Sequence, residues 1–217
     1  MKTLWFIRHA ESLSNAGQPT NRPDDIALSE QGRQQATALA AQWTEEPELI
    51  IVSRYQRTSA TAEPFRQRYA TCEVMTLPVH EFTFLQPALY AGTTEAMRRE
   101  PVRLYWESCD PDSCDGEGAE SFRQFCERVN ASVAELISRP ESRIAIFCHA
   151  YVIKAILWRL LHPTEPVSAS YMRRFHGFHR SLLVPNTSVY PILVLPGGEI
   201  ALRPPMPLRT ERKSLEA

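Results

Sequence analysis

The sequence lacks the features that direct a chain to a membrane or to a polyanion. Its 217 residues carry 24 Lys and Arg against 25 Asp and Glu, a formal net charge of −1, which does not favour binding to nucleic acid or an anionic membrane surface. No apolar run approaches the ~20 residues that a membrane-spanning helix needs, and Arg8 interrupts the first run too early for a signal peptide. We therefore expect a soluble, cytoplasmic protein with no nucleic-acid or membrane partner.

Cysteine pairs and metal-ligand spacings are missing as well. The five cysteines are Cys72, Cys109, Cys114, Cys126 and Cys148. This odd number without ligand-like pairing suits a reducing compartment, so we expect free thiols even at Cys109 and Cys114, which are close in sequence. The acidic stretch "DPDSCDG" (110–116) contains a proline and has the wrong spacing for a calcium loop. No carboxylates accompany the histidines at ligand spacing, so we expect no metal and no cofactor.

Strand-like and helix-like segments alternate along most of the chain. Short apolar runs predict buried strands at 4–7, 48–53 and 143–149, and a further short strand is expected at 74–79. The spacing of apolar residues predicts helices after Ser29, over 57–69 despite Pro64, after Ser121 and from 151 onward. The alternation predicts an α/β fold, a three-layer sandwich in which helices cover both faces of a mostly parallel sheet.

Two regions depart from this alternation. Residues 82–118 show no sustained periodicity, and we expect them to cover the strand ends as a lid or substrate-specificity insertion. Near the end, "SVYPILVL" (188–195) and "EIALR" (199–203) are separated by a Gly-Gly pair and predict a hairpin. We expect one domain over 1–205 and a weakly ordered tail over 206–217. A homodimer through an exposed sheet or helix surface is an additional hypothesis.

Histidines and arginines follow the predicted strands. "LWFIRHA" ends with Arg8 and His9, "RIAIFCHA" delivers His149, and Arg57 comes four residues after the strand at 48–53. Because ligands bind at the carboxyl ends of strands in an open parallel sheet, we expect these four side chains to converge. Guanidinium groups match phosphate oxygens with paired hydrogen bonds. The cluster therefore predicts a site for a phosphoryl group.

A histidine in such a site can act as a nucleophile. A neutral imidazole attacks phosphorus and forms a phosphohistidine, which water then hydrolyses. The neighbouring arginines disfavour the imidazolium form, so the ring stays neutral near physiological pH. They also stabilise charge on the transferring oxygens. The reaction needs an acid for the leaving oxygen, and a carboxyl group near the pocket can supply it.

Five segments together resemble the histidine phosphatase superfamily, the phosphoglycerate-mutase-like enzymes. "RHAES" with Asn15 resembles the signature R-H-G-E-T-x-x-N, and "LSEQGRQQA" resembles the helix start L-T-E-x-G-x-x-Q-A. "SRYQRTSATA" is similar to S-x-x-x-R-A-x-x-T-A, "GAESFRQFCERV" to G-E-S-x-x-x-F-x-x-R-V, and "IFCHAYVIKAIL" to S-H-G-x-x-I-R. These segments stand in the family's order across roughly 150 residues, which implies the phosphoglycerate-mutase-like fold.

The resemblance implies a role for each matching residue. His9 would be the phosphorylated nucleophile. Arg8, Arg57 and His149 would bind the phosphoryl group, with His149 part of the catalytic set, and Asn15 would be a further pocket residue. No metal takes part in this chemistry.

The general acid is implied by its position. The family's acid usually lies just after the third strand, which indicates Glu81 in "PVHEFTF". Glu107 and Asp110 in the irregular segment are the alternatives. The sequence after Glu81 reads "FTFLQPALYAGTT" in place of the family's common G-x-W-E-G continuation, so the identity of the substrate stays open.

Three residues of the signature segments have structural interpretations. Glu11 is expected to act as a structural partner of an arginine or of backbone amides. Ala10 and Ala150 replace the family's usual glycines after the two histidines. A methyl group is tolerated there, provided that neither backbone position needs a positive φ.

The sequence favours a metal-independent phosphomonoester hydrolase that acts through phosphohistidine on a small phosphorylated metabolite. A phosphoglycerate mutase, which passes the group to a substrate hydroxyl, is the second hypothesis, although the chain lacks the long, proline-rich lid sequence of mutases. A weakly active module that binds phosphorylated ligands is the third. His176 and His179, which lie among arginines, either extend the positive pocket toward a second anionic group or form a basic surface patch.

Overall fold

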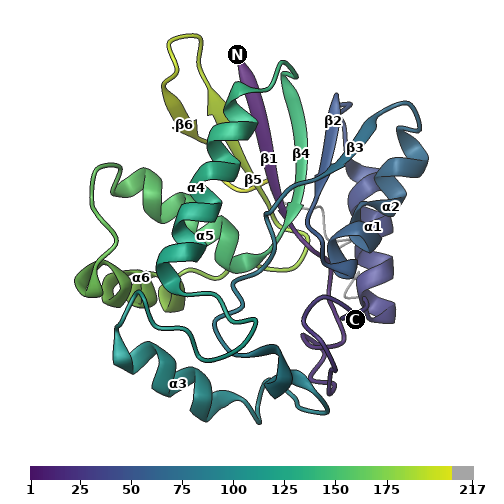
Figure 1. Cartoon of the computed structure of the whole chain (residues 1–217). Helices are drawn as coiled ribbons and strands as arrows, with labels where there is room; N and C mark the ends of the chain where they lie inside the picture. The colour runs from purple at the N-terminus through teal and green to yellow at the C-terminus, as the bar shows by residue number, and fades with distance from the viewer. Residues whose placement is uncertain (207–217) are drawn as a thin grey trace, which may run out of the picture.

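A six-stranded sheet forms the centre of the computed structural model, which describes residues 1–206 (Figure 1). The strands are β1 (Lys2–Arg8), β2 (Leu49–Val52), β3 (Glu73–Thr76), β4 (Arg143–Cys148), β5 (Val189–Val194) and β6 (Ile200–Leu202). Their order is β3-β2-β4-β1-β5-β6, with the first four parallel and β5 and β6 antiparallel to their neighbours. The mostly parallel sheet is confirmed, as is the terminal hairpin.

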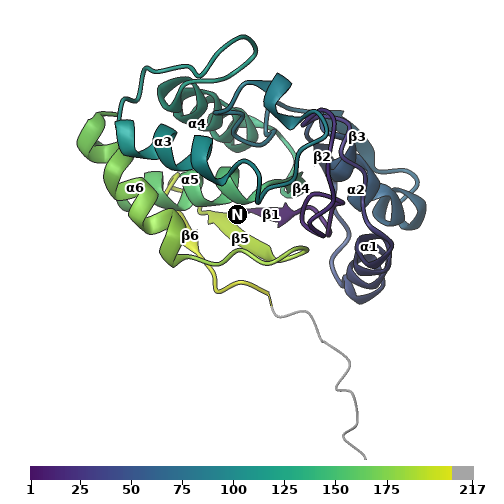
Figure 2. The ribbon, with the colours of Figure 1, turned by 90° about the horizontal axis from the view of Figure 1, so that it is seen from below.

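Helices cover both faces of the sheet. They are α1 (Glu30–Gln42), α2 (Gln56–Arg68), α3 (Arg99–Ser108), α4 (Phe122–Ser138), α5 (Ala150–Leu161) and α6 (Ala169–Ser181), with a short 3-10 helix η1 at Pro87–Tyr90. Because neighbouring strand residues point to opposite faces, Trp5 and Phe147 pack with α1 and α2, while Phe6 and Ile146 pack with α4 and α5. The three-layer sandwich is confirmed (Figures 1 and 2).

Local sequence signals fix where two helices begin. Ser29 caps α1 by accepting a hydrogen bond from the Gly32 backbone N–H, and Ser121 forms a capping box with Gln124 at the start of α4. β3 is shorter than the predicted 74–79. Its pairing with β2 ends near Leu77 because Pro78 has no backbone N–H to donate.

The segment 82–118 is more regular than its sequence suggests, which corrects our interpretation of it. It contains η1 and the helix α3, where Tyr105 and Trp106 are buried. Pro101 in the first turn and the exposed ion pairs of Arg103 with Glu100 and Glu107 obscure the helical pattern in the sequence. The segment lies across the end of the sheet at which the parallel strands finish (Figures 1 and 2).

Three further expectations concern features outside the sheet. Within residues 1–206, no helix has the length and apolar character needed to cross a membrane. All five cysteines are free, including Cys109 and Cys114. Met206, assigned to the weakly ordered tail, instead donates its backbone N–H to Val189 at 3.0 Å. The rest of that predicted tail, 207–217, lies outside the described residues.

Gly32 allows α1 to lie against the loop that follows β1. A Cβ atom at this position would lie 2.0 Å from the carbonyl oxygen of Glu11. We expect Gly32→Ala to lower the free energy of unfolding by about 3 kcal/mol, because a backbone group has to move. Gly177→Ala in α6 meets no atom within 4 Å and should raise it by about 0.5–1 kcal/mol. Urea unfolding of the wild type and both variants measures these changes, and equal free energies of unfolding for the two variants would contradict the prediction.

Candidate active site

The predicted convergence of four side chains is observed. β1, β4 and β2 are neighbours in the sheet, so Arg8 and His9 after β1, His149 after β4 and Arg57 in the first turn of α2 meet at one end. The rings of His9 and His149 lie 5.1 Å apart between centroids. Arg57 donates from Nε to Nε2 of His9 at 3.2 Å. Two imidazoles and two guanidinium groups thus share one corner of the molecule.

His9 presents a defined tautomer. Its Nδ1 lies 2.7 Å from the carbonyl oxygen of Ala10, while its Nε2 accepts from Arg57. A carbonyl only accepts and an arginine only donates, so the neutral ring carries its proton on Nδ1 and a lone pair on Nε2. Burial, followed by the charges of Arg57 and Arg8, holds the pKa of His9 well below 6.5. The neutral, nucleophilic form therefore dominates at physiological pH.

His149 is fully buried behind His9. Its Nε2 lies 2.9 Å from the Ser53 hydroxyl, and its Nδ1 is buried without a hydrogen-bond partner. Burial, the charge of Arg57 and the nearby His9 lower the pKa of His149 well below 6.5. His149 is not among the described residues that line the adjoining cavity. Its orphaned nitrogen is an unused polar group directly beside the cluster.

The two arginines are held by carbonyl groups rather than by carboxylates. Arg57 donates from Nη1 to the carbonyl of Pro23 at 2.6 Å, and its guanidinium lies over the ring of Tyr55. Arg8 donates from Nη1 to the carbonyl of Val184 at 2.6 Å, and its Nε is buried without a partner. Two largely buried positive charges with only neutral partners form a site suited to an anion.

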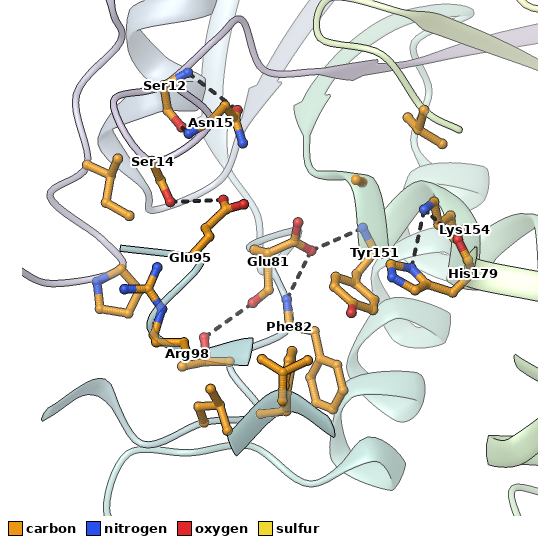
Figure 3. Close-up of a pocket in the computed structure, with 18 of the residues that line it drawn as sticks. Ser12, Ser14, Asn15, Glu81, Phe82, Glu95, Arg98, Tyr151, Lys154 and His179 are labelled. Atoms are coloured by element: carbon orange, nitrogen blue, oxygen red, sulfur yellow. Dashed lines mark hydrogen bonds between the residues drawn. The ribbon is translucent and has the colours of Figure 1, made fainter. Parts of the chain in front are cut away.

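Glu81 lies on the cavity wall, as predicted. Its Oε1 accepts hydrogen bonds from the backbone N–H groups of Phe82 and Tyr151, both at 3.1 Å (Figure 3). Burial raises the pKa of Glu81, against the opposing effects of Arg57 and Arg8. A raised pKa favours the protonated form of this carboxyl group, which is the form that a general acid needs. Neither alternative acid, Glu107 or Asp110, is among the lining side chains of the described chain.

The remaining predicted residues also have clear positions. Asn15 lines the cavity, and its Oδ1 accepts from Asn186 Nδ2 at 3.1 Å and from the Ser12 backbone N–H at 3.4 Å. Glu11 has a structural partner, but this is the Ser29 hydroxyl, which donates to it at 2.6 Å, and not the expected arginine or backbone amides.

The two replaced glycines cause no strain. The non-glycine residues with positive φ in the described chain are Cys109 and Thr187. Neither Ala10 nor Ala150 is among them, so the condition under which a methyl group is tolerated is met.

The cluster opens into a cavity of about 850 Å³. The segment 82–118 supplies part of its wall through Tyr90, Glu95 and Arg98, and the Ser14 hydroxyl donates to Glu95 at 3.0 Å (Figure 3). This segment therefore closes the side of the cavity away from the sheet. Within residues 1–206, no group of three or more His, Cys, Asp or Glu side chains is arranged to hold a metal ion.

Lys154, which was not among the predicted site residues, lies on the cavity wall beside His179. A signal was present. Lys154 is the single charged residue in the first two turns of an otherwise apolar helix, and burying a lone ammonium group is unfavourable without a purpose. The basic segment around His176 and His179 belongs to α6 and lines the cavity, so it is part of the pocket rather than a remote surface patch.

Comparison with known proteins places this site in a family. The sequence matches the histidine phosphatase superfamily (branch 1) over residues 4–197, whereas a search of curated protein sequences gives no match.

Solved phosphatases share the fold along nearly the whole chain. α-Ribazole phosphatase from Shigella flexneri is 21% identical, with a TM-score of 0.70, over 93% of this chain and 94% of that chain. Phosphoserine phosphatase from Entamoeba histolytica, in complex with 3-phosphoglyceric acid, is 20% identical, with a TM-score of 0.71 and coverages of 96% and 98%. Mycobacterial glucosyl-3-phosphoglycerate phosphatase, in complex with VO3, is 25% identical, with a TM-score of 0.66 and coverages of 94% and 97%. The chain belongs to the histidine phosphatase superfamily, and it is a phosphatase.

Proposed function

We propose that the protein is a metal-independent phosphomonoester hydrolase that forms a phosphohistidine on His9. The observation that carries the proposal is the neutral His9 ring, with its proton fixed on Nδ1 by Ala10 and its Nε2 lone pair beside Arg57. A lone pair held next to guanidinium groups is placed to meet a bound phosphoryl group. The substrate phosphate replaces His9 as the partner of Arg57 Nε when it binds.

In the first step His9 Nε2 attacks phosphorus, and the bond between phosphorus and the ester oxygen breaks. Glu81, whose protonated form is favoured because burial raises its pKa, gives its proton to the leaving oxygen. Arg8 and Arg57 stabilise the charge on the transferring oxygens, in the place that a metal ion takes in other phosphatases. Once the phosphoryl group is on His9, whose ring lies 5.1 Å from that of His149, the unpartnered Nδ1 of His149 donates a hydrogen bond to one of its oxygens. The products are phosphohistidine and the free alcohol.

In the second step water attacks the phosphohistidine. Glu81, now ionised, accepts a proton from that water, the bond between phosphorus and Nε2 breaks, and inorganic phosphate leaves. His9 returns to its neutral form, and Glu81 is again protonated.

The cavity supports a small substrate. Its volume of about 850 Å³ is within the range that suits a metabolite-sized ligand. We place the activity in the cytoplasm, which five free cysteines support. The homodimer stays a prediction.

Hydrolysis of 4-nitrophenyl phosphate in the presence of excess EDTA tests the proposal directly. We expect full activity with the chelator, because arginines rather than a metal supply the positive charge. Activity that EDTA removes and Mg²⁺ or Zn²⁺ restores would contradict the proposal.

We expect Glu81→Gln to slow selectively the hydrolysis of substrates with poor leaving groups. It should lower kcat/KM, which reports formation of the phosphoenzyme, about 10²- to 10³-fold for glycerol 3-phosphate. For 4-nitrophenyl phosphate it should change little, because nitrophenolate leaves without a proton. In the wild type, the ratio of kcat/KM for glycerol 3-phosphate to that for the aryl ester should fall as pH rises through the raised pKa of Glu81.

Glu95→Gln is the matched control, since Glu95 is the other glutamate on the cavity wall. In Glu95→Gln, kcat/KM for both substrates should stay near the wild-type values, and their ratio should still fall as pH rises. If Glu81→Gln lowers kcat/KM equally for the two substrates, another group is the acid. The same conclusion follows if the ratio of the two kcat/KM values still falls as pH rises in this variant.

A further inference from the structure

Lys154 is a buried ammonium group without an acidic partner. It is 7% exposed on the cavity wall. Its Nζ donates to the carbonyl of His179 at 2.9 Å and lies 3.2 Å from Nδ1 of the same residue (Figure 3). Among the described residues, no carboxylate comes within ion-pair distance of it. An ammonium group has three donors, so one remains for a group in the cavity.

A neutral His179 ring accepts a hydrogen bond from this lysine. Burial, followed by the charge of Lys154, lowers the pKa of His179 to about 3, so its ring is neutral and accepts at Nδ1. The ring is stacked on Tyr151, with centroids 4.1 Å apart and planes 7° from parallel. Trp106 and His176 stack beside it, 4.6 Å apart at 9°. This stack fixes the position of the lysine head group.

The cavity as a whole has an excess of positive charge. Seven arginine and lysine side chains line it, against two glutamates, in a chain whose formal net charge is −1. Arg8 and Arg57 are beside the nucleophile, and Arg103 is already ion-paired with Glu100 and Glu107. More positive charge remains than one phosphoryl group neutralises, so a second anion is electrostatically favoured.

Lys154 is close enough to the nucleophile for one small molecule to reach both. It lies five residues after His149 along α5, a rise of about 7.5 Å. Burial lowers the pKa of Lys154, and the charges of Glu81, which raises it, and Arg8, which lowers it further, act on it from nearby. A ligand with a phosphate at His9 and a second anion a few bonds away spans this interval.

We propose that Lys154, held by His179, binds a second anionic group of the substrate, so that the natural substrate is a small phosphomonoester with a carboxylate or a second phosphate. This inference depends on the proposed hydrolysis at His9. A purely structural lysine that ties α5 to α6 is the competing explanation. The two differ in what substitution changes: substrate preference in the first case, stability alone in the second.

Matched pairs of probes measure that preference. 3-Phosphoglycerate and glycerol 3-phosphate differ by a carboxylate in place of a hydroxymethyl group. Propane-1,3-diol bisphosphate and 3-hydroxypropyl phosphate differ by a second phosphate. We expect the anionic member of at least one pair to have a kcat/KM at least about tenfold higher in the wild type, since one charged hydrogen bond is worth that factor. The pair that discriminates identifies the anion.

Lys154→Met should reduce the ratio of kcat/KM values, anionic member over its counterpart without the second anion, to about one. Because it replaces a buried charge with an apolar side chain of similar length, we expect it to fold and to unfold at a temperature no lower than the wild type. Arg159→Met, on the same helix but bonded to the carbonyl of Glu165 outside the cavity, should retain the wild-type preference. Equal preference ratios in the wild type and Lys154→Met, or no preference in either pair, would overturn the inference.

Binding to the inactive His9→Ala variant separates this inference from the proposed function. Isothermal titration of the same pairs should show tighter binding of the anionic member, and Lys154→Met in that background should remove the difference. Hydrolysis of all four probes without preference would refute the subsite and leave the hydrolase intact. Preference in binding without any hydrolysis by the wild type would refute the hydrolase and retain the anion site.

Discussion

We expect His9→Ala to lower kcat for 4-nitrophenyl phosphate about 10⁴- to 10⁶-fold, the largest effect of any substitution in the chain. The reason is that the proposed route needs a covalent bond to Nε2, and alanine offers no atom for it. Neither neighbouring group can substitute. His149 is fully buried behind His9, and Glu81 is held by two backbone N–H groups. Steady-state hydrolysis of the purified variant measures the loss.

His162→Ala is the matched control. His162 ends α5, packs on the ring of Trp158 and is not part of the cavity wall, so its removal should leave kcat within about twofold. Rapid quenching of the wild type with labelled substrate should also reveal acid-labile phosphate on the protein, absent in His9→Ala. Retention of activity by His9→Ala would end the phosphohistidine mechanism.

We expect Arg57→Lys to lower kcat/KM about 10²- to 10³-fold although it keeps the positive charge. Arg57 contacts His9 through Nε and Pro23 through Nη1, and this fork places its remaining donors beside the nucleophile. A lysine has a single nitrogen and cannot span both contacts. Arg54→Lys is the control, since Arg54 is exposed, neighbours the same tyrosine ring and lies outside the cavity wall.

Arg57→Met separates charge from geometry. The charge of Arg57 lowers the pKa of His9, so its removal should raise that pKa. Activity requires neutral His9 and is lost as pH falls through its pKa, so the acidic limb of the kcat/KM profile should move to higher pH in Arg57→Met. In Arg57→Lys the limb should stay near its wild-type position. A shift shared by both variants would show that the charge of Arg57 is not what lowers the pKa of His9, and no shift in either variant would show that Arg57 has no effect on that pKa.

The sheet and the cluster of His9, His149 and Arg57 could be predicted because the signals for them lie within short stretches of sequence. The runs at 4–7 and 144–148 are apolar over every residue, which favours burial on both faces and hence a parallel sheet. Parallel strands end at the same edge, so a residue placed just after each strand must lie near the others. Caps such as Ser29 and Ser121 act within three residues, and they are readable for the same reason.

The wall opposite the sheet was not predictable in the same way. α3 has Pro101 in its first turn and buries Tyr105 and Trp106 against Phe82, Phe84 and Phe122, contacts that no local pattern encodes. The third strand is cut short by a single proline. The burial of α3 depends on partners far along the chain, whereas the early end of the third strand is a local effect of Pro78.

By itself, the sequence determined the α/β fold, the family and the histidines and arginines that meet at one end of the sheet, because hydrophobic periodicity and short motifs are local properties. Only the tertiary structure decided which tautomer His9 adopts, that Glu81 is held by the amide of Tyr151, and that Lys154 lacks a carboxylate. Those facts depend on atoms brought together from distant segments, 70 residues apart for Glu81 and Tyr151. The electrostatics of a site are set by such long-range proximity and by the water it excludes, neither of which a linear pattern contains.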